Sequence, residues 1–178
     1  MKHAIQRYPE VEHNQDFVNL IVATLTAPTD FNPILLEVTG NDHRAGTISA
    51  YLHSNLNHSF MYWLSAESDN TARTISERTG LFCDCHGLLQ PYSEMCHTSI
   101  ALNLPEQIPD SRLLKAAIQT LLHSSNRAVL ITAGIIKNAD KACYVAGRTY
   151  RTRSQLVELL EPTHSFMANG SLVMAWFK

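Results

Sequence analysis

Residues 127–161, RAVLITAGIIKNADKACYVAGRTYRTRSQLVELLE, decide the fold that we expect for this chain. The short apolar run 128–133 is rich in β-branched residues, which predicts a buried strand rather than a helix. The alternation along 141–149 predicts a second strand. Thr152 and Gln155 then have the spacing of a capping box, in which a hydroxyl and an amide satisfy free backbone N–H groups at a helix start. The stretch therefore predicts strand, strand and helix in close succession.

The rest of the chain alternates between helical and strand patterns. Helices are expected near 15–25, from Asn41 or Asp42, from Asp69 or Asn70 to Gly80, and from Asp110 or Ser111; further strands are expected at 34–39, 60–64, 99–104 and 172–177. Strands separated by helices imply crossover connections. We therefore predict an α/β (or α+β) fold: a mixed, partly antiparallel sheet of about five to six strands with helices packed against it. Residues 1–14 are predicted to be a polar N-terminal arm, and 15–178 a single globular domain.

Composition limits the functions that the chain can have. Of its 178 residues, 45% are hydrophobic and 17% charged, with a formal net charge of −2. No overall field would attract nucleic acid or an acidic membrane, so any such binding needs a local patch. No apolar run is long enough to span a bilayer, and the first residues lack a signal-peptide core, so we expect a cytoplasmic protein without membrane contact. Its four cysteines are then reduced thiols or metal ligands.

Positive charge gathers in one segment, and we interpret it as a basic ribbon that grips DNA or RNA. Its candidate nucleic-acid-binding residues are Lys137, Lys141, Arg148, Arg151 and Arg153, with Tyr144 and Tyr150 among them. Cations attract phosphates whatever the sequence, and aromatic rings stack on unpaired bases. The alternative is a solvated edge strand, on which cations discourage aggregation.

A cluster of cysteine and histidine residues suggests a zinc site. Its candidate ligands are Cys83, Cys85, His86, Cys96 and His97. Thiolate and imidazole are ligands that zinc prefers, and four are enough. The C-x-C spacing differs from the usual C-x₂-C, so the alternative is a loop of reduced thiols.

The run 38–82 resembles the acyl-CoA-binding half of GCN5-type N-acetyltransferases. A strand leads through a loop with Arg44 and Gly46 into a helix, then a second strand and a helix that ends at Gly80. The resemblance implies acetyl-CoA as a ligand, held by backbone N–H groups at the helix start. The chain departs from that family in having a single glycine in the loop, and Ser76 where the family usually has tyrosine.

The sequence therefore favours a small cytoplasmic nucleic-acid-binding regulatory or accessory protein that uses the basic ribbon and the helix after it. A homodimer formed by strand pairing would suit such a protein. The alternatives are an N-acetyltransferase-like enzyme that binds acyl-CoA through 38–82, and a non-catalytic protein–protein interaction domain. No nucleotide-binding glycine fingerprint is present, and no motif is specific enough to name a reaction.

Overall fold

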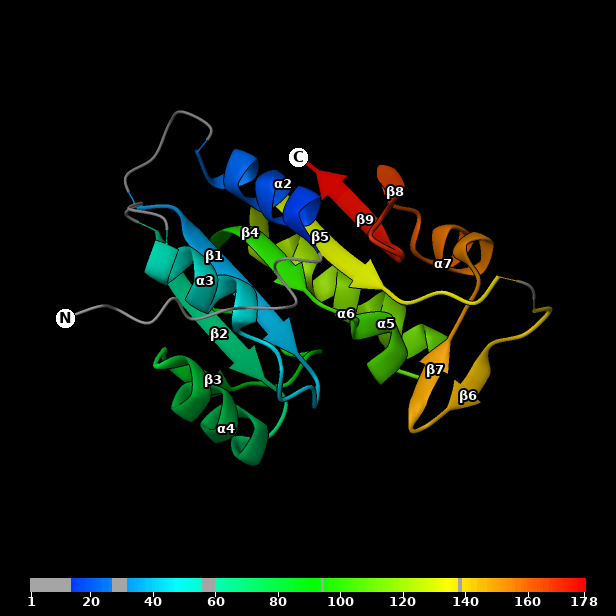
Figure 1. Ribbon diagram of the computed structural model, residues 1–178, viewed down its shortest axis with the longest axis horizontal. Helices are drawn as coiled ribbons and strands as arrows, with labels where there is room; N and C mark the ends of the chain where they lie inside the picture. Colours follow the sequence, from blue (N-terminus) through cyan, green and yellow to red (C-terminus); the bar gives the residue numbers. More distant parts are fainter. Residues whose placement is uncertain (1–13, 27–31, 56–59, 94, 138) are drawn as a thin grey trace.

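The chain folds into three layers, a central sheet with helices on both faces (Figure 1). The computed structural model describes residues 14–26, 32–55, 60–93, 95–137 and 139–178. The helices are α2 (Gln15–Thr26), α3 (Thr47–Asn55), α4 (Asp69–Thr79), α5 (Leu104–Gln107), α6 (Ser111–Ser124) and α7 (Arg153–Leu160). The strands are β1 (Ile34–Thr39), β2 (Met61–Ala66), β3 (Cys83–Cys85), β4 (Cys96–Ala101), β5 (Ser125–Ala133), β6 (Cys143–Val145), β7 (Arg148–Tyr150), β8 (His164–Ala168) and β9 (Ser171–Phe177).

The central sheet has seven strands in the order β3-β2-β1-β4-β5-β9-β8. The five strands from β3 to β5 are parallel, and β9 runs antiparallel to both β5 and β8. The predicted fold class, a mixed α/β sheet with an antiparallel part and helices packed on it, is confirmed. Because the strand order runs one way from β1 to β3 and the other way from β4 to β5, a topological switch point lies between β1 and β4.

Both faces of the sheet are buried, which explains why the central strands are apolar on both sides. Leu36, Val129 and Met174 pack on one face with α6 and α7. Leu35 and Val173 point to the other face and pack with α2 and α3. The continuous apolar runs in β1, β5 and β9 are therefore the signature of central strands, as the sequence predicted for 128–133.

Local signals place most of the helix ends. Asp110 caps α6 by accepting from Arg112 N and Leu113 N, and the capping box of Thr152 and Gln155 starts α7. Gly80 ends α4 with φ 73°. The exception is α3, which begins at Thr47 rather than near Asp42, because the intervening residues form the loop of the switch point.

Pairing between distant residues differs from the sequence expectation at three places. Residues 141–149 form no single strand: Ala146 and Gly147 both have positive φ, which makes a tight turn of the β6–β7 hairpin. Strands β3 and β8 were not predicted. They are short or exposed and exist because they pair with β2 and β9.

The polar arm expected at 1–14 lies outside the described residues except for Asn14. The single domain from 15 to 178 stays a prediction. Among the helices that the structure describes, none has the length and apolarity needed to cross a membrane.

Candidate functional site

The carboxyl ends of β1 and β4 form the candidate ligand site. In doubly wound sheets the connections from two neighbouring strands leave in opposite directions at the switch point, which opens a crevice. Here the loop after β1 (40–46) and the segment after β4 (102–107) face each other there. Asp42, Arg44, Ala45, Leu102 and Asn103 enclose a cavity of about 30 Å³ between them.

A buried carboxylate fixes the loop after β1. Glu37 accepts from Gly46 N at 2.7 Å, and from Ser49 N at 3.1 Å and Ser49 Oγ at 2.6 Å. Burial raises the pKa of Glu37, while the hydrogen bonds to Ser49 and Gly46 oppose that change. Gly46 has φ 85°, and a Cβ there would lie 2.5 Å from Leu64 Cδ2. These contacts hold the start of α3 tightly against β1 and β2.

Two consecutive backbone N–H groups in this loop point into the crevice. Gly40 N and Asn41 N donate to Gln107 Oε1 at 3.0 and 3.1 Å, and Thr39 Oγ1 also lies 3.1 Å from that oxygen. The Gln107 amide nitrogen donates to Leu102 O at 3.2 Å and to Asn103 O at 3.0 Å. A single side chain from α5 thus bridges the ends of β1 and β4.

An acidic residue follows the neighbouring strand. Glu67 comes directly after β2 and is exposed. A Cβ on Gly40 would lie 3.6 Å from Glu67 Oε2 and 3.1 Å from Gln107 Oε1. Because Gly40 has no side chain, its backbone is open to both groups. The crevice therefore offers paired N–H donors beside a carboxylate.

The β6–β7 hairpin is tied to the same loop. Asp42 Oδ2 accepts from Arg44 Nη2 at 2.9 Å and from Arg148 Nη2 at 3.1 Å. Burial opposes ionisation of Asp42, but the hydrogen bonds from the two arginines prevail and lower its pKa to about 2. The side chain of Asp42 is 8% exposed, so the link between loop and hairpin is largely shielded from water.

A second buried carboxyl lies under this hairpin. Glu106 on α5 is 3% exposed, and its Oε1 accepts from Gly134 N at 2.5 Å. No protein hydrogen bond to its Oε2 is found within the described part of the chain. Burial raises the pKa of Glu106 to about 7, against the opposing hydrogen bond from Gly134.

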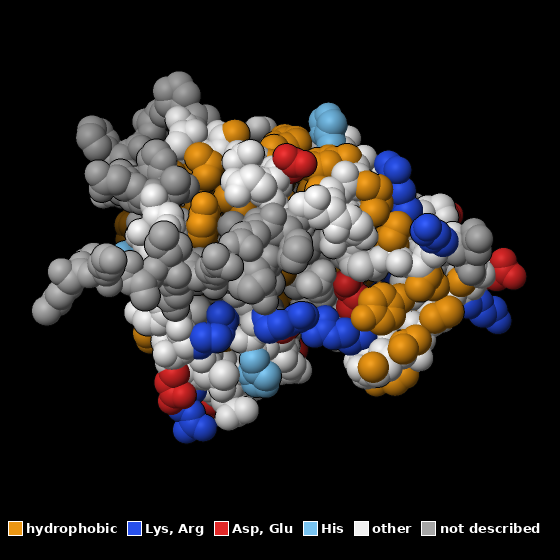
Figure 2. Space-filling model, viewed as in Figure 1, with side chains coloured by type: hydrophobic (Ala, Val, Ile, Leu, Met, Phe, Trp, Pro, Cys, Tyr) orange, Lys and Arg blue, Asp and Glu red, His pale blue; other side chains and the backbone are white. Residues whose placement is uncertain are grey.

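Hydrophobic side chains gather over the hairpin, on the face that Figure 2 shows. Tyr144 is 72% exposed and Val145 57% exposed. Since Arg148 joins this hairpin to the loop after β1, the apolar surface lies next to the crevice. Tyr144, which the sequence pattern suggests for base stacking, lies beside Val145 in this apolar patch.

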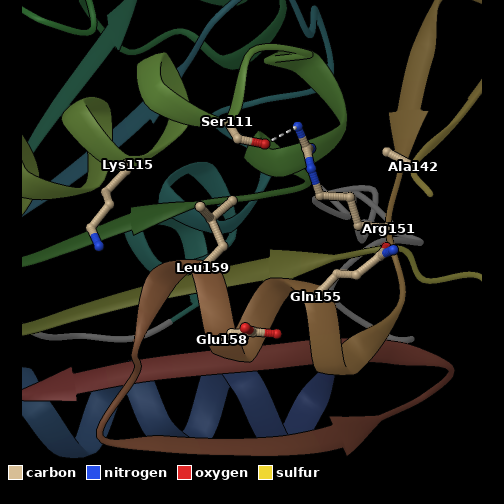
Figure 3. Close-up of a pocket in the computed structure, with 7 residues that line it drawn as sticks. All are labelled: Ser111, Lys115, Ala142, Arg151, Gln155, Glu158 and Leu159. Carbon is tan, nitrogen blue, oxygen red and sulfur yellow. Dashed lines mark hydrogen bonds between the residues drawn. The ribbon is translucent and has the colours of Figure 1, made fainter. Parts of the chain in front are cut away.

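A larger cavity lies elsewhere. It has a volume of about 460 Å³ and is lined by Ser111, Lys115, Ala142, Arg151, Gln155, Glu158 and Leu159 (Figure 3). Arg151 turns toward Ser111 and away from Lys115, which lies further along α6. None of these residues belongs to β1, β4 or their loops. The buried cation among them, Arg151, already donates hydrogen bonds to backbone carbonyl groups.

The seven residues of the predicted basic ribbon do not form one surface. Arg151 is 4% exposed and donates to Pro105 O, Ile108 O and Pro109 O, so it braces α5 and the segment after it. Arg148 binds Asp42, and Arg153 donates to Ser165 O at 3.2 Å. Lys137, Lys141 and Tyr144 are exposed, while Tyr150 is partly buried against Gly134. Two of the three arginines are thus engaged inside the fold.

The expected zinc site is wrong. No group of three or more histidine, cysteine, aspartate or glutamate side chains in the described ranges could hold a metal ion. Cys83, Cys85 and His86 lie in or next to β3, whereas Cys96 and His97 open β4, on the far side of β2 and β1. His97 Nδ1 accepts from Ile34 N at 3.0 Å, and the Cys96 thiol is fully buried beside Ser99. The two halves of the cluster are separated by two strands.

The main site residues were missed because their signal was weak in the sequence. The sequence pattern predicts the strand 34–39 but singles out none of Gly40, Glu67 and Gln107. A strand that ends in Thr39-Gly40-Asn41 before a helix, followed by a strand that ends in an acid, was the available signal. Gln107 gave none, because its partners lie 67 residues away in the chain.

Solved structures with the same arrangement cover nearly the whole chain. The magnesium protoporphyrin IX methyltransferase ChlM from Synechocystis PCC 6803, with bound SAH, matches with a TM-score of 0.65 at 14% identity, over 98% of this chain and 87% of that one. The O-methyltransferase NcsB1 from neocarzinostatin biosynthesis, in complex with S-adenosyl-L-homocysteine (SAH) and 1,4-dihydroxy-2-naphthoic acid, matches with 0.65 at 14%, over 96% and 56%. The cyclase SpnF matches with 0.61 at 16%, over 82% and 54%. No family model and no curated protein sequence matches the chain.

These likenesses overturn the functions expected from the sequence. The similar structures of ChlM and NcsB1 are methyltransferases with SAH bound, so the nucleic-acid-binding regulator, with DNA or RNA as its partner, is a wrong prediction. The resemblance of 38–82 to N-acetyltransferases, with its acetyl-CoA, reflects only the β1-α3-β2-α4 unit, which forms half of this larger doubly wound sheet. The non-catalytic interaction domain is not favoured by these likenesses either, and the strand-paired homodimer stays a prediction. What the comparisons show for this chain is its fold, a doubly wound sheet of the kind found in these methyltransferases.

Proposed function

We propose that the chain binds S-adenosylmethionine (SAM) in the crevice between β1 and β4 and transfers its methyl group to a small-molecule acceptor. The observation that carries this proposal is the pair of N–H groups of Gly40 and Asn41 at the switch point, beside the carboxylate of Glu67. Backbone N–H pairs suit a carboxylate, and an acid at the end of the next strand suits the hydroxyls of a ribose.

The residues present fit the two ends of SAM. Gly40 and Asn41 would face its amino-acid end, and Glu67 its ribose. Bound SAM supplies a methyl group on a positively charged sulfur, which an electron-rich atom of the acceptor can attack. The exposed apolar side chains of Tyr144 and Val145 would contact the acceptor and help to exclude water, which favours an acceptor with an apolar ring.

Calorimetric titration with SAM and SAH tests the proposal. We expect saturable binding with one site per chain, and a rise in melting temperature, because a ligand that binds only the folded state stabilises it. Glu67→Ala should weaken binding at least about tenfold, since a charged partner of a hydroxyl contributes roughly 1.5–3 kcal/mol. Glu77→Ala, which removes an exposed carboxylate on α4, is the matched control and should bind normally.

A transfer assay follows from the binding data. SAM with a labelled methyl group would be incubated with a panel of phenolic and carboxylic aromatic acceptors, and labelled product would be scored. If the wild-type chain bound none of SAM, SAH and adenosine at millimolar concentration, the proposal would be wrong for this chain.

The cytoplasmic location stays a prediction, which fractionation of cells that express the protein would test.

A further inference from the structure

The amide of Gln107 fills the part of the crevice where the amino-acid end of a ligand would lie. Its oxygen faces three donors, from Thr39, Gly40 and Asn41, and its nitrogen faces two carbonyl oxygens, of Leu102 and Asn103. An amide has one acceptor oxygen and two N–H donors, so all of its hydrogen-bonding capacity is used. The opposite orientation would set an NH₂ group against the two backbone N–H groups.

This pattern has the chemistry of an α-amino acid. A carboxylate accepts hydrogen bonds, and an ammonium group donates them. The amide of Gln107 presents an acceptor to the turn after β1 and a donor to the end of β4, which are the same two roles. The protein thus carries its own neutral substitute for the amino-acid end of a ligand.

The space around Gln107 supports the same reading. Gly40 is buried, and a Cβ added there would approach Gln107 Oε1 to 3.1 Å. The neighbouring cavity, which is lined by Asp42, Arg44, Ala45, Leu102 and Asn103, measures only about 30 Å³. Small-molecule sites in proteins usually have about 300–1,000 Å³. The amino-acid end of a ligand can therefore reach the N–H groups of Gly40 and Asn41 only after the Gln107 side chain leaves them.

We propose that Gln107 is an internal competitor for this subsite, so that ligands with an amino-acid end must displace it while the nucleoside part binds without doing so. This inference rests on the proposed function, because it assigns the crevice to an S-adenosyl ligand. An incoming carboxylate would regain the lost hydrogen bonds in charge-assisted form, which makes the exchange feasible. The apparent dissociation constant for such ligands equals the intrinsic constant divided by the fraction of molecules in which Gln107 has moved away. A small fraction therefore means weak apparent binding.

The test compares two ligands that differ only at this end. SAH carries the homocysteine end, whereas 5′-methylthioadenosine is the same thioether nucleoside without it. Wild type should bind the two with similar affinity, because the gain from the amino-acid end is offset by the loss of the Gln107 bonds. Gln107→Ala should bind SAH about tenfold or more tighter and 5′-methylthioadenosine unchanged, since only one ligand uses the vacated subsite. Gln119→Ala, on the exposed face of α6, is the control for a glutamine-to-alanine change.

Each outcome of this comparison either supports the inference or overturns it. A wild type that binds SAH far more tightly than 5′-methylthioadenosine, with no gain in Gln107→Ala, overturns the inference and leaves the proposed function intact. Binding of SAH by Gln107→Ala alone supports the inference and shows that the wild-type crevice is closed to that ligand. If neither protein binds either ligand, both the inference and the proposed function fail. Should Gln107→Ala not fold, the ratio of the two wild-type affinities decides alone.

Discussion

At the scale of single residues, a few side chains and glycines set the shape of the crevice. Glu37 joins β1 to the start of α3, and Gly46 lets α3 and α4 approach each other closely. Glu106 is held beneath the hairpin with one oxygen bound to Gly134 N. Such groups have few acceptable substitutes, because each is buried among fixed partners.

Two glycines with positive φ should differ sharply in their tolerance of alanine. At Gly46 a Cβ would lie 2.5 Å from Leu64 Cδ2, while at Gly80 no atom lies within 4 Å. Gly80→Ala should cost only the backbone strain, about 1–2 kcal/mol. Gly46→Ala adds overpacking of about 1–3 kcal/mol. Urea denaturation measures both, and equal losses would contradict the close contact at Gly46.

The buried carboxyl of Glu106 should make stability depend on pH. Its pKa is about 7 in the folded chain, against 4.5 for an ordinary glutamate, so the native state holds the proton more tightly. Stability should therefore be greatest below pH 4.5 as far as this group is concerned, and fall as pH rises to 7, by about 3 kcal/mol at most. The charges that face it are those of Arg148, Arg151 and Asp42.

Glu106→Gln isolates that contribution, because the amide oxygen can still accept from Gly134 N and cannot ionise. The variant should gain stability relative to wild type between pH 5 and 8, as measured by denaturation at each pH. Parallel pH profiles for the two proteins would show that Glu106 does not titrate in this range.

At the scale of elements, the β6–β7 hairpin is attached through two arginines with different tasks. Arg148 binds Asp42 in the loop after β1, and Arg151 binds the backbone after β4. These contacts explain why the basic segment is not a nucleic-acid ribbon: its central cations are used to hold the hairpin beside the crevice.

Removal of Arg148 should loosen the hairpin. Arg148→Ala should speed hydrogen exchange in 143–150 roughly tenfold, equivalent to about 1.4 kcal/mol of local stability. Arg44→Ala removes the other partner of Asp42, which lies in the same loop and does not join the two elements. It should leave exchange in the hairpin nearly unchanged. If hydrogen exchange in 143–150 accelerated equally in both variants, the stability of the hairpin would depend on neutralising the charge of Asp42 rather than on the link between the two elements.

Arg151 should matter for stability far more than its neighbour Arg153. Arg151→Met leaves the carbonyls of Pro105, Ile108 and Pro109 without their donor, and should cost about 2–4 kcal/mol. Arg153 is exposed, so Arg153→Ala should change stability by no more than about 0.5 kcal/mol. Denaturant unfolding of the two variants gives the comparison, which a small loss at Arg151 would contradict.

Elements with local signals were predictable, and those that depend on distant partners were not. Asp110, Thr152 and Gly80 mark helix ends through hydrogen bonds or φ values within a few residues, and the sequence located them. Strand β3 has three residues and exists only because β2 pairs with it. In the site the same limit applied: the bond between Gly40 and Gln107 requires the strand order, which the pattern of residues does not contain.

At the scale of the whole molecule, the central sheet joins the layers. Successive residues of β9 contribute to both cores, since Met174 belongs to the cluster under α6 and α7, and Val173 to the cluster under α2 and α3. A disturbance on one face should therefore reach the other.

The two tryptophans test whether the described chain unfolds as one unit. Trp63 lies on β2 and Trp176 on β9, with β1, β4 and β5 between these strands. In Trp63→Phe and in Trp176→Phe, the fluorescence of the remaining tryptophan should follow the same denaturation curve as far-ultraviolet circular dichroism. Separate midpoints would show that the two ends of the sheet melt independently, against the predicted single domain.

The position of β9 also determines when the central sheet can be completed during synthesis on the ribosome. Strand β9 is made last of the described elements, yet it lies between β5 and β8. Until residues 171–177 leave the exit tunnel, the long apolar strand β5 has no β9 beside it and presents an unpaired edge. Such an edge favours aggregation, and a chaperone would have to cover it. Synthesis, rather than the folded state, is thus the stage at which this chain is most exposed to aggregation.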